Sequence, residues 1–358
     1  MIPAQATDIT ADWLNEQLGD GVGAITGVRC EHIGEGVGVL GEVARLHLDY
    51  ATGETGPPTM VAKCQSLYPD NIGLSQMMGF YRREVNFYNE LASSVNLRVP
   101  KPYVAQVAPE GAPFVLIIEE ITDARPIDQL EGANSDDAQA LIQTLAALHA
   151  PYWHNDALFA LDWLPPMNND LYKAASGLAE ANWPQFKVER GPQLPAEMMT
   201  ACEALTPRYG DMVDWMAELE PMTVAHTDPR GDNILIGGSA GDGTLVLLDY
   251  QLMTRHLGAW DVAYFLGQSC RAEDRRAWQD SMLDLYLEAL AGHGVTDYAR
   301  EDLVRHYRYC LMHQAWAQIA VANLDPGNER GRQLLTTMLT RAFDAAHEND
   351  GIELLEKF

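Results

Sequence analysis

Paired cysteines, long apolar segments and basic residues are all scarce in this chain of 358 residues. The five cysteines are scattered without close pairs, which argues against a disulfide framework or a zinc site and predicts reduced thiols. The longest apolar runs, such as residues 114–118, are far shorter than the ~20 residues that span a bilayer. The first ten residues show neither a basic segment nor an apolar one, so we expect no signal peptide and a cytoplasmic protein.

Acidic residues dominate the charge of the chain. Fifty-one acidic residues face 24 basic ones, for a formal net charge of -27. Repulsion between like charges opposes nucleic acids and anionic membranes as partners, so we expect neither. A nucleotide is not excluded, because Mg²⁺ and one lysine can neutralise its phosphates inside a cleft. The charge would also suit a cationic substrate, although a solvated acidic surface is the simpler explanation.

The spacing of apolar residues predicts strands in the first third of the chain. Apolar and polar residues alternate at 43–50, as they do in a half-buried strand. The expected strands cover residues 28–33, 43–50, 59–65 and 114–118, and a hairpin around residues 110–111 is expected to lead into the last of them. Two helices are expected among them, at residues 12–18 and 74–91, the second from its apolar stripe.

The remainder of the chain has a helical pattern with one exception. Two short apolar runs, 234–236 and 245–248, flank a polar turn and predict a hairpin. A strand-rich start and a helix-rich remainder predict an α+β protein of two lobes. The boundaries that we expect are residues 1–118 for the first lobe and 119–358 for the second, with a hinge about 119–123.

Three glycines, Gly36, Gly38 and Gly41, form a GxGxxG string that precedes an expected strand. In a dinucleotide-binding fold such a string leads into a helix, so the strand that follows here argues against that fold. A glycine-rich turn between strands can fold over phosphates and expose its backbone N–H groups. An ordinary flexible hairpin is the alternative interpretation of this string.

Lys63 lies in the middle of an apolar strand, although the chain has only five lysines. Burying an ammonium group costs several kcal/mol unless it is paired. Glu84, beside the apolar stripe of the following helix, can supply that partner. Such a pair would hold the amine toward the α- and β-phosphates of a nucleotide. The alternative is a lysine that reaches solvent at the end of its strand.

The strongest signal is an HxDxxxxN run at residues 226–233, which leads directly into the predicted hairpin. Asp228 lies within this run and Asn233 closes it, whereas Asp249 follows the second strand of the hairpin. A hairpin brings its two ends together, so Asn233 and Asp249 are expected side by side. An amide oxygen and a carboxylate suit Mg²⁺, while a second carboxylate can orient an acceptor hydroxyl.

These segments resemble the aminoglycoside phosphotransferase/choline kinase-like family of the protein-kinase-like fold. The resemblance is carried by the HxDxxxxN run, by Asp-Tyr-Gln at 249–251 and by the segment 258–266. Leu-Ala-Ala-Leu-His-Ala at 145–150 also resembles the family's helix before the catalytic loop. Within the family, the chain looks most similar to the ecdysteroid-kinase-like (CHK-like) group. The resemblance covers about residues 25–270 and implies an antiparallel-sheet first lobe with one main helix, followed by a mostly helical lobe.

The resemblance implies a role for each matching residue. Asp228 would be the catalytic base or the group that orients the acceptor. The remaining roles would be Mg²⁺ ligands at Asn233 and Asp249, a phosphate contact at Lys63 with Glu84 as partner, adenine contacts from the backbone at Glu119 and Ile121, and braces of the catalytic loop at His226 and Asp261. The implied cofactors are ATP and Mg²⁺, and the implied activity is that of a small-molecule O-kinase.

Two departures from protein kinases favour a small acceptor. Thr227 stands where arginine or glycine is common, so a phosphorylated activation loop has no obvious partner. Gln251 replaces a glycine, and the short interval between Asp249 and Asp261 leaves no room for a peptide-docking segment. We therefore expect a hydroxylated small molecule as acceptor and no protein substrate.

The nature of that acceptor is less determined. Residues 151–222 are rich in Trp, Pro, Tyr and Met and could line a pocket for a bulky hydrophobic alcohol, or fill the core of the helical lobe. An aminoglycoside- or choline-type kinase with a cationic acceptor is an alternative, which requires a cluster of carboxylates or aromatic rings. A catalytically silent nucleotide-binding module is a third hypothesis, disfavoured because Lys63, Asp228, Asn233 and Asp249 are all present.

Overall fold

The computed structural model describes residues 1–33, 40–324 and 328–358. The chain divides into two compact units. Unit 1 comprises Met1–Ser94, Arg98–Ala124 and Gly238–Gly241, and unit 2 comprises Val95–Leu97, Arg125–Gly237 and Asp242–Phe358. No helix among the described residues is both long enough and apolar enough to cross a membrane.

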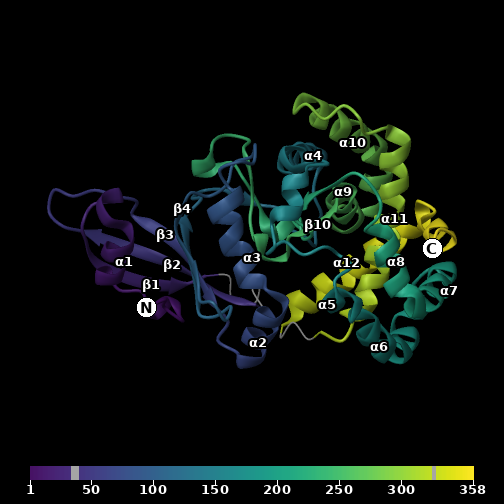
Figure 1. Cartoon of the computed structure of the whole chain (residues 1–358), viewed down its shortest axis with the longest axis horizontal. Coiled ribbons are helices and arrows are strands. Elements are labelled where there is room, and N and C mark those ends of the chain that lie inside the picture. The colour runs from purple at the N-terminus through teal and green to yellow at the C-terminus, as the bar shows by residue number, and fades with distance from the viewer. Residues whose placement is uncertain (34–39, 325–327) are drawn as a thin grey trace. The chain divides into compact units, whose positions relative to one another are not determined.

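Unit 1 is built on a five-stranded antiparallel sheet in the order β1-β2-β3-β5-β4. The strands are β1 (Ile25–His32), β2 (Gly41–Tyr50), β3 (Thr59–Gln65), β4 (Pro102–Val107) and β5 (Phe114–Glu119). Helix α1 (Ala11–Leu18) lies against this sheet and buries Leu14 in a core with Leu46 and Met60 (Figure 1). The antiparallel first lobe predicted from the sequence is thereby confirmed.

The helix predicted at residues 74–91 is wrong in its extent. The structure has α2 (Pro69–Met78), then α3 (Phe80–Asn86), which continues into a π-helical turn over Phe87–Leu91. Gly79 separates α2 from α3 because its φ of 73° is left-handed, a conformation that favours glycine and ends a helix. The apolar stripe is broken there too: Leu74 and Met77 are exposed, whereas the apolar residues of α3 are buried.

Unit 2 is mostly helical, as predicted. Its helices are α4 (Ser135–His149), α5 (Asp170–Lys173), α6 (Ala175–Glu189), α7 (Ala196–Leu205), α8 (Tyr209–Met216), α9 (Ala259–Tyr264), α10 (Ala272–Gly292), α11 (Arg300–Ala320) and α12 (Glu329–Glu348). The long helix α11 packs against α6, α9 and α12. At its centre Trp316 is fully buried and stacks on Tyr209 with ring centroids 3.8 Å apart.

Two small sheets interrupt the helices of unit 2. The predicted hairpin is present as β8 (Ile234–Ile236) and β9 (Leu245–Leu247), joined at its edge by β6 (Arg125–Pro126). A second antiparallel pair, β7 (Met222–Ala225) and β10 (Thr254–Leu257), was not predicted. Its strands have only four residues each, all buried except the partly exposed Arg255, and lack the alternation that identifies a strand.

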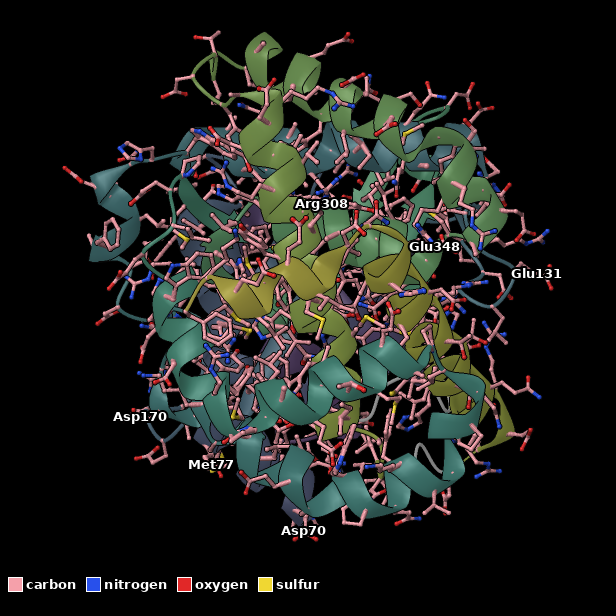
Figure 2. All side chains as sticks on the ribbon, turned by 90° about the vertical axis from the view of Figure 1, so that its right-hand side faces the viewer. Asp70, Met77, Glu131, Asp170, Arg308 and Glu348 are labelled. Atoms are coloured by element: carbon pink, nitrogen blue, oxygen red, sulfur yellow. The ribbon has the colours of Figure 1, made fainter. Side chains whose placement is uncertain are left out.

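Charged side chains cover the outside of unit 2. Figure 2 shows Glu131 and Asp170 at its periphery, where both are exposed to solvent. Some acidic residues form ion pairs across helices: Glu348 on α12 lies 2.6 Å from Arg275 on α10. Arg275 is only 2 % exposed and Glu348 is 28 % exposed, so the pair joins a buried guanidinium to a carboxylate near the surface.

Candidate active site

Lys63 and Glu84 meet within unit 1, as the sequence suggested. Lys63 occupies the centre of β3, between Val43 of β2 and Leu116 of β5. Its ammonium Nζ lies 2.9 Å from Glu84 Oε1 and 2.8 Å from Oε2. The Lys63 side chain is 14 % exposed and that of Glu84 only 2 %, so the carboxylate is the buried member of the pair. The structure does not show the alternative, in which Lys63 reaches solvent at the end of its strand.

The glycine string is only partly described. Gly36 and Gly38 lie outside the described residues, whereas Gly41 begins β2. A side chain at Gly41 would place its Cβ 3.0 Å from the Cys64 carbonyl and 3.8 Å from Lys63 Cε. Backbone at this position therefore passes close to the lysine side chain, which is the type of approach that glycine permits.

Glu119 is the last residue of β5, and Ile121 lies two residues further along the chain, also in unit 1. The Glu119 N–H donates to the Lys101 carbonyl at 2.9 Å, and both carboxylate oxygens accept from Arg98 Nη2 at 2.7 Å. A nucleotide base would therefore use the carbonyl group of Glu119 rather than its N–H or its side chain.

Unit 2 carries the loop that contains the HxDxxxxN run, between β7 and β8. His226 begins this loop, and its ring binds backbone on both sides. Ring Nε2 lies 3.0 Å from the Leu248 carbonyl, and Nδ1 accepts from the Asp228 N–H at 3.3 Å. A carbonyl can only accept, so the ring proton must sit on Nε2, and the imidazole is neutral. His226 thus holds the loop to the strand end beside it and has no free nitrogen for proton transfer.

Asp261 on α9 fixes the same loop from the other side. Its Oδ2 accepts from the His226 N–H at 2.7 Å, and its Oδ1 from the Thr227 N–H at 2.8 Å. The carboxylate is fully buried, and His149 Nε2 lies 3.0 Å from Oδ2. His149 Nδ1 in turn contacts the Tyr286 hydroxyl at 2.7 Å. These contacts connect Asp261 to two backbone N–H groups of the loop, and they add His149, which the sequence analysis did not identify as part of the site.

Thr227 has a left-handed backbone, with a φ of 67°. This backbone conformation costs free energy in a residue other than glycine, so glycine would adopt it more readily here. Besides its N–H bond to Asp261, its hydroxyl donates to the Leu252 carbonyl at 2.6 Å. The hydrogen bond from the hydroxyl offsets part of this free-energy cost, and glycine could not form it.

The carboxylate of Asp228 is held at both oxygens. Oδ1 accepts a hydrogen bond of 2.7 Å from the Tyr264 hydroxyl, and Oδ2 accepts one of 3.1 Å from Asn233 Nδ2. Arg230 Nε lies 3.7 Å from the same Oδ2. Burial and the nearby Asp228 carboxylate hold the pKa of Tyr264 well above its ordinary value, so the phenol stays protonated. Neither Tyr264 nor Arg230 was identified from the sequence.

Asn233 and Asp249 lie at the same end of the hairpin. Ile234 pairs with Leu247 across β8 and β9, and the Leu248 N–H donates to the Asn233 carbonyl at 2.9 Å. The Asn233 amide NH₂ is directed to Asp228, which leaves its oxygen as the atom available for a cation.

The donor set at this hairpin end fits Mg²⁺. An amide oxygen from Asn233 and a carboxylate from Asp249 are hard oxygen ligands of the kind that this ion takes. Gln251 Nε2 donates to Asp249 at 3.2 Å, and the buried Gln251 Oε1 has no hydrogen-bond partner. Among the described residues, no group of three or more His, Cys, Asp or Glu could hold a metal ion by itself. Phosphate oxygens or water molecules would therefore have to complete the coordination.

Arg230 is the cation of this loop. Attraction to Asp228 raises the pKa of its guanidinium, with smaller contributions from Tyr264, Asp232 and Asp249. One positive charge thus balances several acids in a small volume. Its Nε is buried without a hydrogen-bond partner, so the interaction with Asp228 is an ion pair rather than a direct hydrogen bond.

The tryptophans of residues 151–222 pack mainly within unit 2. Trp153 is buried against Tyr298 with ring centroids 5.1 Å apart, and Trp215 contacts Tyr309 at 5.4 Å. Trp153 therefore belongs to the core of unit 2, whereas Trp163, Trp183 and Trp215 are only partly buried. A small pocket lies in the same unit, lined in part by Met167, His256 and His313.

Comparison with known proteins accounts for this arrangement. The model of a phosphotransferase enzyme family matches residues 78–304, which is more than half of the chain. None of the curated proteins matches it.

Solved structures share the fold at low sequence identity. Choline kinase from Cryptosporidium parvum Iowa II is 12% identical, with a TM-score of 0.55 over 92% of this chain and 93% of that one. The GDP and kanamycin complex of APH(2")-IIia is 13% identical, with a TM-score of 0.55 over 94% and 96% of the two chains. A mutant aminoglycoside 2'-phosphotransferase-IIIa with GDP is 16% identical, with a TM-score of 0.51 over 92% and 90%. The chain therefore has the protein-kinase-like fold and belongs to the phosphotransferase enzyme family.

Proposed function

We propose that this phosphotransferase is a small-molecule kinase that transfers the γ-phosphate of ATP to a hydroxyl group. The observation that carries the proposal is the geometry around Asp228, whose carboxylate is fixed at both oxygens beside Asn233. A carboxylate held in this way can orient an acceptor hydroxyl for attack on phosphorus. Membership of the family supports the same reaction class.

In the proposed reaction Asp228 accepts a hydrogen bond from the acceptor hydroxyl. It takes the proton as the oxygen bonds to the γ-phosphorus and the bond to the ADP oxygen breaks. Asn233 Oδ1 and Asp249 would hold Mg²⁺, which when bound supplies positive charge to the phosphates. His226 and Asp261 keep the loop in place through backbone bonds rather than taking part in proton transfer.

Unit 1 would bind the nucleotide. Lys63, held by Glu84, would contact the phosphates, and Gly36, Gly38 and Gly41 would cover them. The backbone carbonyl of Glu119 and the N–H of Ile121 would meet the adenine. In this scheme the lobe of residues 1–118 binds ATP, and the lobe of residues 119–358 supplies the catalytic loop and the acceptor pocket.

The acceptor class is proposed in two forms. A bulky hydrophobic alcohol is the first, as in the ecdysteroid-kinase-like group that the sequence resembles. The second is a cationic acceptor, which the net charge of -27 would attract. A choline kinase and a kanamycin complex among the structural neighbours are examples of such acceptors. The Trp153 and Trp215 contacts inside unit 2 reduce the support for an aromatic-lined pocket.

The test is phosphoryl transfer by the purified chain. MgATP or MgGTP is supplied with a panel of choline, kanamycin, a steroid alcohol and a terpenoid alcohol, and products are followed by ADP or GDP release and by the mass of one added phosphate. We expect one acceptor to gain a phosphate and Asp228→Asn to lower the rate at least about a hundredfold.

Asp242→Asn is the matched control, because Asp242 is an exposed residue of the same unit. Full activity of Asp228→Asn would remove the role assigned to this carboxylate. Nucleotide-dependent thermal stabilisation with no transfer to any alcohol, nor to water, would instead identify a silent nucleotide-binding module.

A further inference from the structure

We propose that Tyr264 is a positioning residue that sets the orientation of the Asp228 carboxylate and thereby the rate of phosphoryl transfer. The inference rests on the proposed function, since it concerns the same carboxylate. Tyr264 lies outside the HxDxxxxN run, 36 residues beyond Asp228 in the chain. Its assignment comes from the contact between the two side chains.

The contact fixes a rotation that the protein backbone leaves free. A carboxylate on a short side chain can turn about its Cβ–Cγ bond, and this rotation decides which oxygen faces an acceptor. Tyr264 holds Oδ1 at 2.7 Å, and Asn233 Nδ2 holds Oδ2 at 3.1 Å from the opposite end. Hydrogen bonds to an ionised group are stronger than those between neutral groups. With both in place the carboxylate plane is defined before any substrate binds.

Asn233 alone would hold the carboxylate less firmly. Its Nδ2 also donates to the Asp228 backbone carbonyl at 3.0 Å, so one amide group serves two acceptors. Arg230 Nε lies 3.7 Å from Oδ2, beyond hydrogen-bond distance, and provides charge rather than direction. The Tyr264 hydroxyl therefore makes the shortest of these contacts to the carboxylate.

Tyr264 is itself placed by the helix that braces the loop. It is the last residue of α9, three positions after Asp261, so the two side chains project on the same side of the helix. Asp261 binds the backbone N–H groups of His226 and Thr227, while Tyr264 binds the side chain of Asp228. One helical turn thus positions both the backbone and the carboxylate of the catalytic loop.

The segment that follows supports a functional interpretation. Residues Phe265–Ser269 form a π-helical turn directly after Tyr264. Such turns are rare and occur frequently at functional sites. The phenol can act here only as a donor, because the ionised carboxylate only accepts. Phenylalanine would keep the ring and its packing but leave Oδ1 without this donor.

The experiment compares Tyr264→Phe with a matched hydroxyl deletion. Tyr307→Phe removes a buried hydroxyl that donates to Gln279 at 3.2 Å in the helical core of the same unit. Transfer is measured on the alcohol of the choline, kanamycin, steroid and terpenoid panel that the wild-type chain phosphorylates fastest. We expect Tyr264→Phe to lower kcat by about tenfold to a hundredfold, which corresponds to about 1.4–2.8 kcal/mol, with the KM for ATP unchanged within twofold. Tyr307→Phe is expected to leave kcat within twofold.

A double-mutant cycle identifies the route of the effect. If Tyr264 acts through Asp228, Tyr264→Phe added to Asp228→Asn will lower the remaining rate by less than twofold. A full further loss in that background, or equal kcat values for Tyr264→Phe and Tyr307→Phe, overturns the inference while the proposed function stands. Inactivity of the wild-type chain toward the panel and toward water overturns the proposed function and this inference together.

Discussion

Asp261 Oδ2 accepts a hydrogen bond of 2.7 Å from the backbone N–H of His226, although the two residues are 35 positions apart. The bond ties the start of the loop at residues 226–233 to helix α9, which is remote from it in sequence. Since the same carboxylate also accepts from Thr227 and contacts His149, a single buried charge satisfies several donors at once. Its removal should therefore affect both stability and activity.

Asp261→Asn is expected to lower the free energy of unfolding of unit 2 by about 3 kcal/mol. Asparagine keeps one oxygen acceptor but turns an NH₂ group toward N–H donors, so at least one of the present bonds is lost. Urea unfolding followed by tryptophan fluorescence measures the change. Asp284→Asn, which removes an exposed ion pair with Arg300, is the control and should cost less than about 1 kcal/mol. Equal stability of the two variants would contradict the bracing role.

Lys63→Met is expected to reduce kcat/KM for the nucleotide at least about tenfold, because the phosphates lose a cation. It also removes the ammonium next to Glu84, whose side chain is 2 % exposed, and should cost about 3 kcal/mol of stability. Adding Glu84→Gln should restore part of the stability but none of the activity. Lys101→Met serves as control, since Lys101 is exposed over the Tyr103 ring. A double variant less stable than Lys63→Met would argue against the ion pair as the cause.

Arg230→Gln is expected to make the stability of the chain depend more strongly on Mg²⁺. The guanidinium interacts most strongly with Asp228 and also with Asp232 and Asp249, so its loss leaves carboxylates to repel one another. A divalent cation would relieve that repulsion. Melting temperatures in EDTA and in excess MgCl₂ measure the effect, with Arg276→Gln as the exposed control on α10. The same Mg²⁺ response in wild type and Arg230→Gln would show that the arginine does not balance these acids.

The stability of the chain is expected to fall as the pH drops from about 6.5 to about 4. Burial, with a smaller effect of Arg305, lowers the pKa of His306 to about 4, and burial lowers that of His313 to about 3. In the unfolded chain both rings bind a proton near pH 6.5. Between pH 6.5 and the lower pKa of the folded state, the unfolded chain therefore holds more protons, and the free energy of unfolding decreases as the pH falls. For His306 the full effect is about 3 kcal/mol.

The measurement is urea unfolding at a series of pH values. His306→Gln should flatten the dependence between pH 6.5 and 4, because this position no longer titrates. His293→Gln is the matched control, as His293 is exposed at the end of α10. An unchanged slope in His306→Gln would show that other groups cause the loss.

Much of the fold followed from local patterns. The strands at residues 43–50 and 59–65 and the β8–β9 hairpin could be predicted because alternation and turn residues are contained in short stretches of chain. The break at Gly79 could not, since a glycine within a helical pattern does not reveal whether its φ will be left-handed. Strands β7 and β10 could not be predicted for a related reason. Each has only four residues, mostly buried, which is too few to show the period of two that identifies a strand.

The site divides in the same way. Asp228, Asn233 and Asp249 could be grouped because one loop and one hairpin determine their proximity. Tyr264 and His149 act on that loop from helices that are remote in sequence, so their roles depend on packing that the sequence does not display. The only indication of Tyr264 in the sequence is its spacing of three residues from Asp261, which places both side chains on one side of a helix. Arg230 was within the motif, but its buried ion pair became visible only with the coordinates.

Helix α9 is held from behind by α11, where Gln314 Nε2 donates to the Trp260 carbonyl at 2.9 Å and His313 packs edge-on against the Trp260 ring. A change at Gln314 would move Asp261 and Tyr264 together, without touching either substrate. Laboratory selection for faster or slower turnover should consequently recover substitutions on the inner face of α11. These substitutions would change kcat and leave the affinity for the nucleotide unchanged.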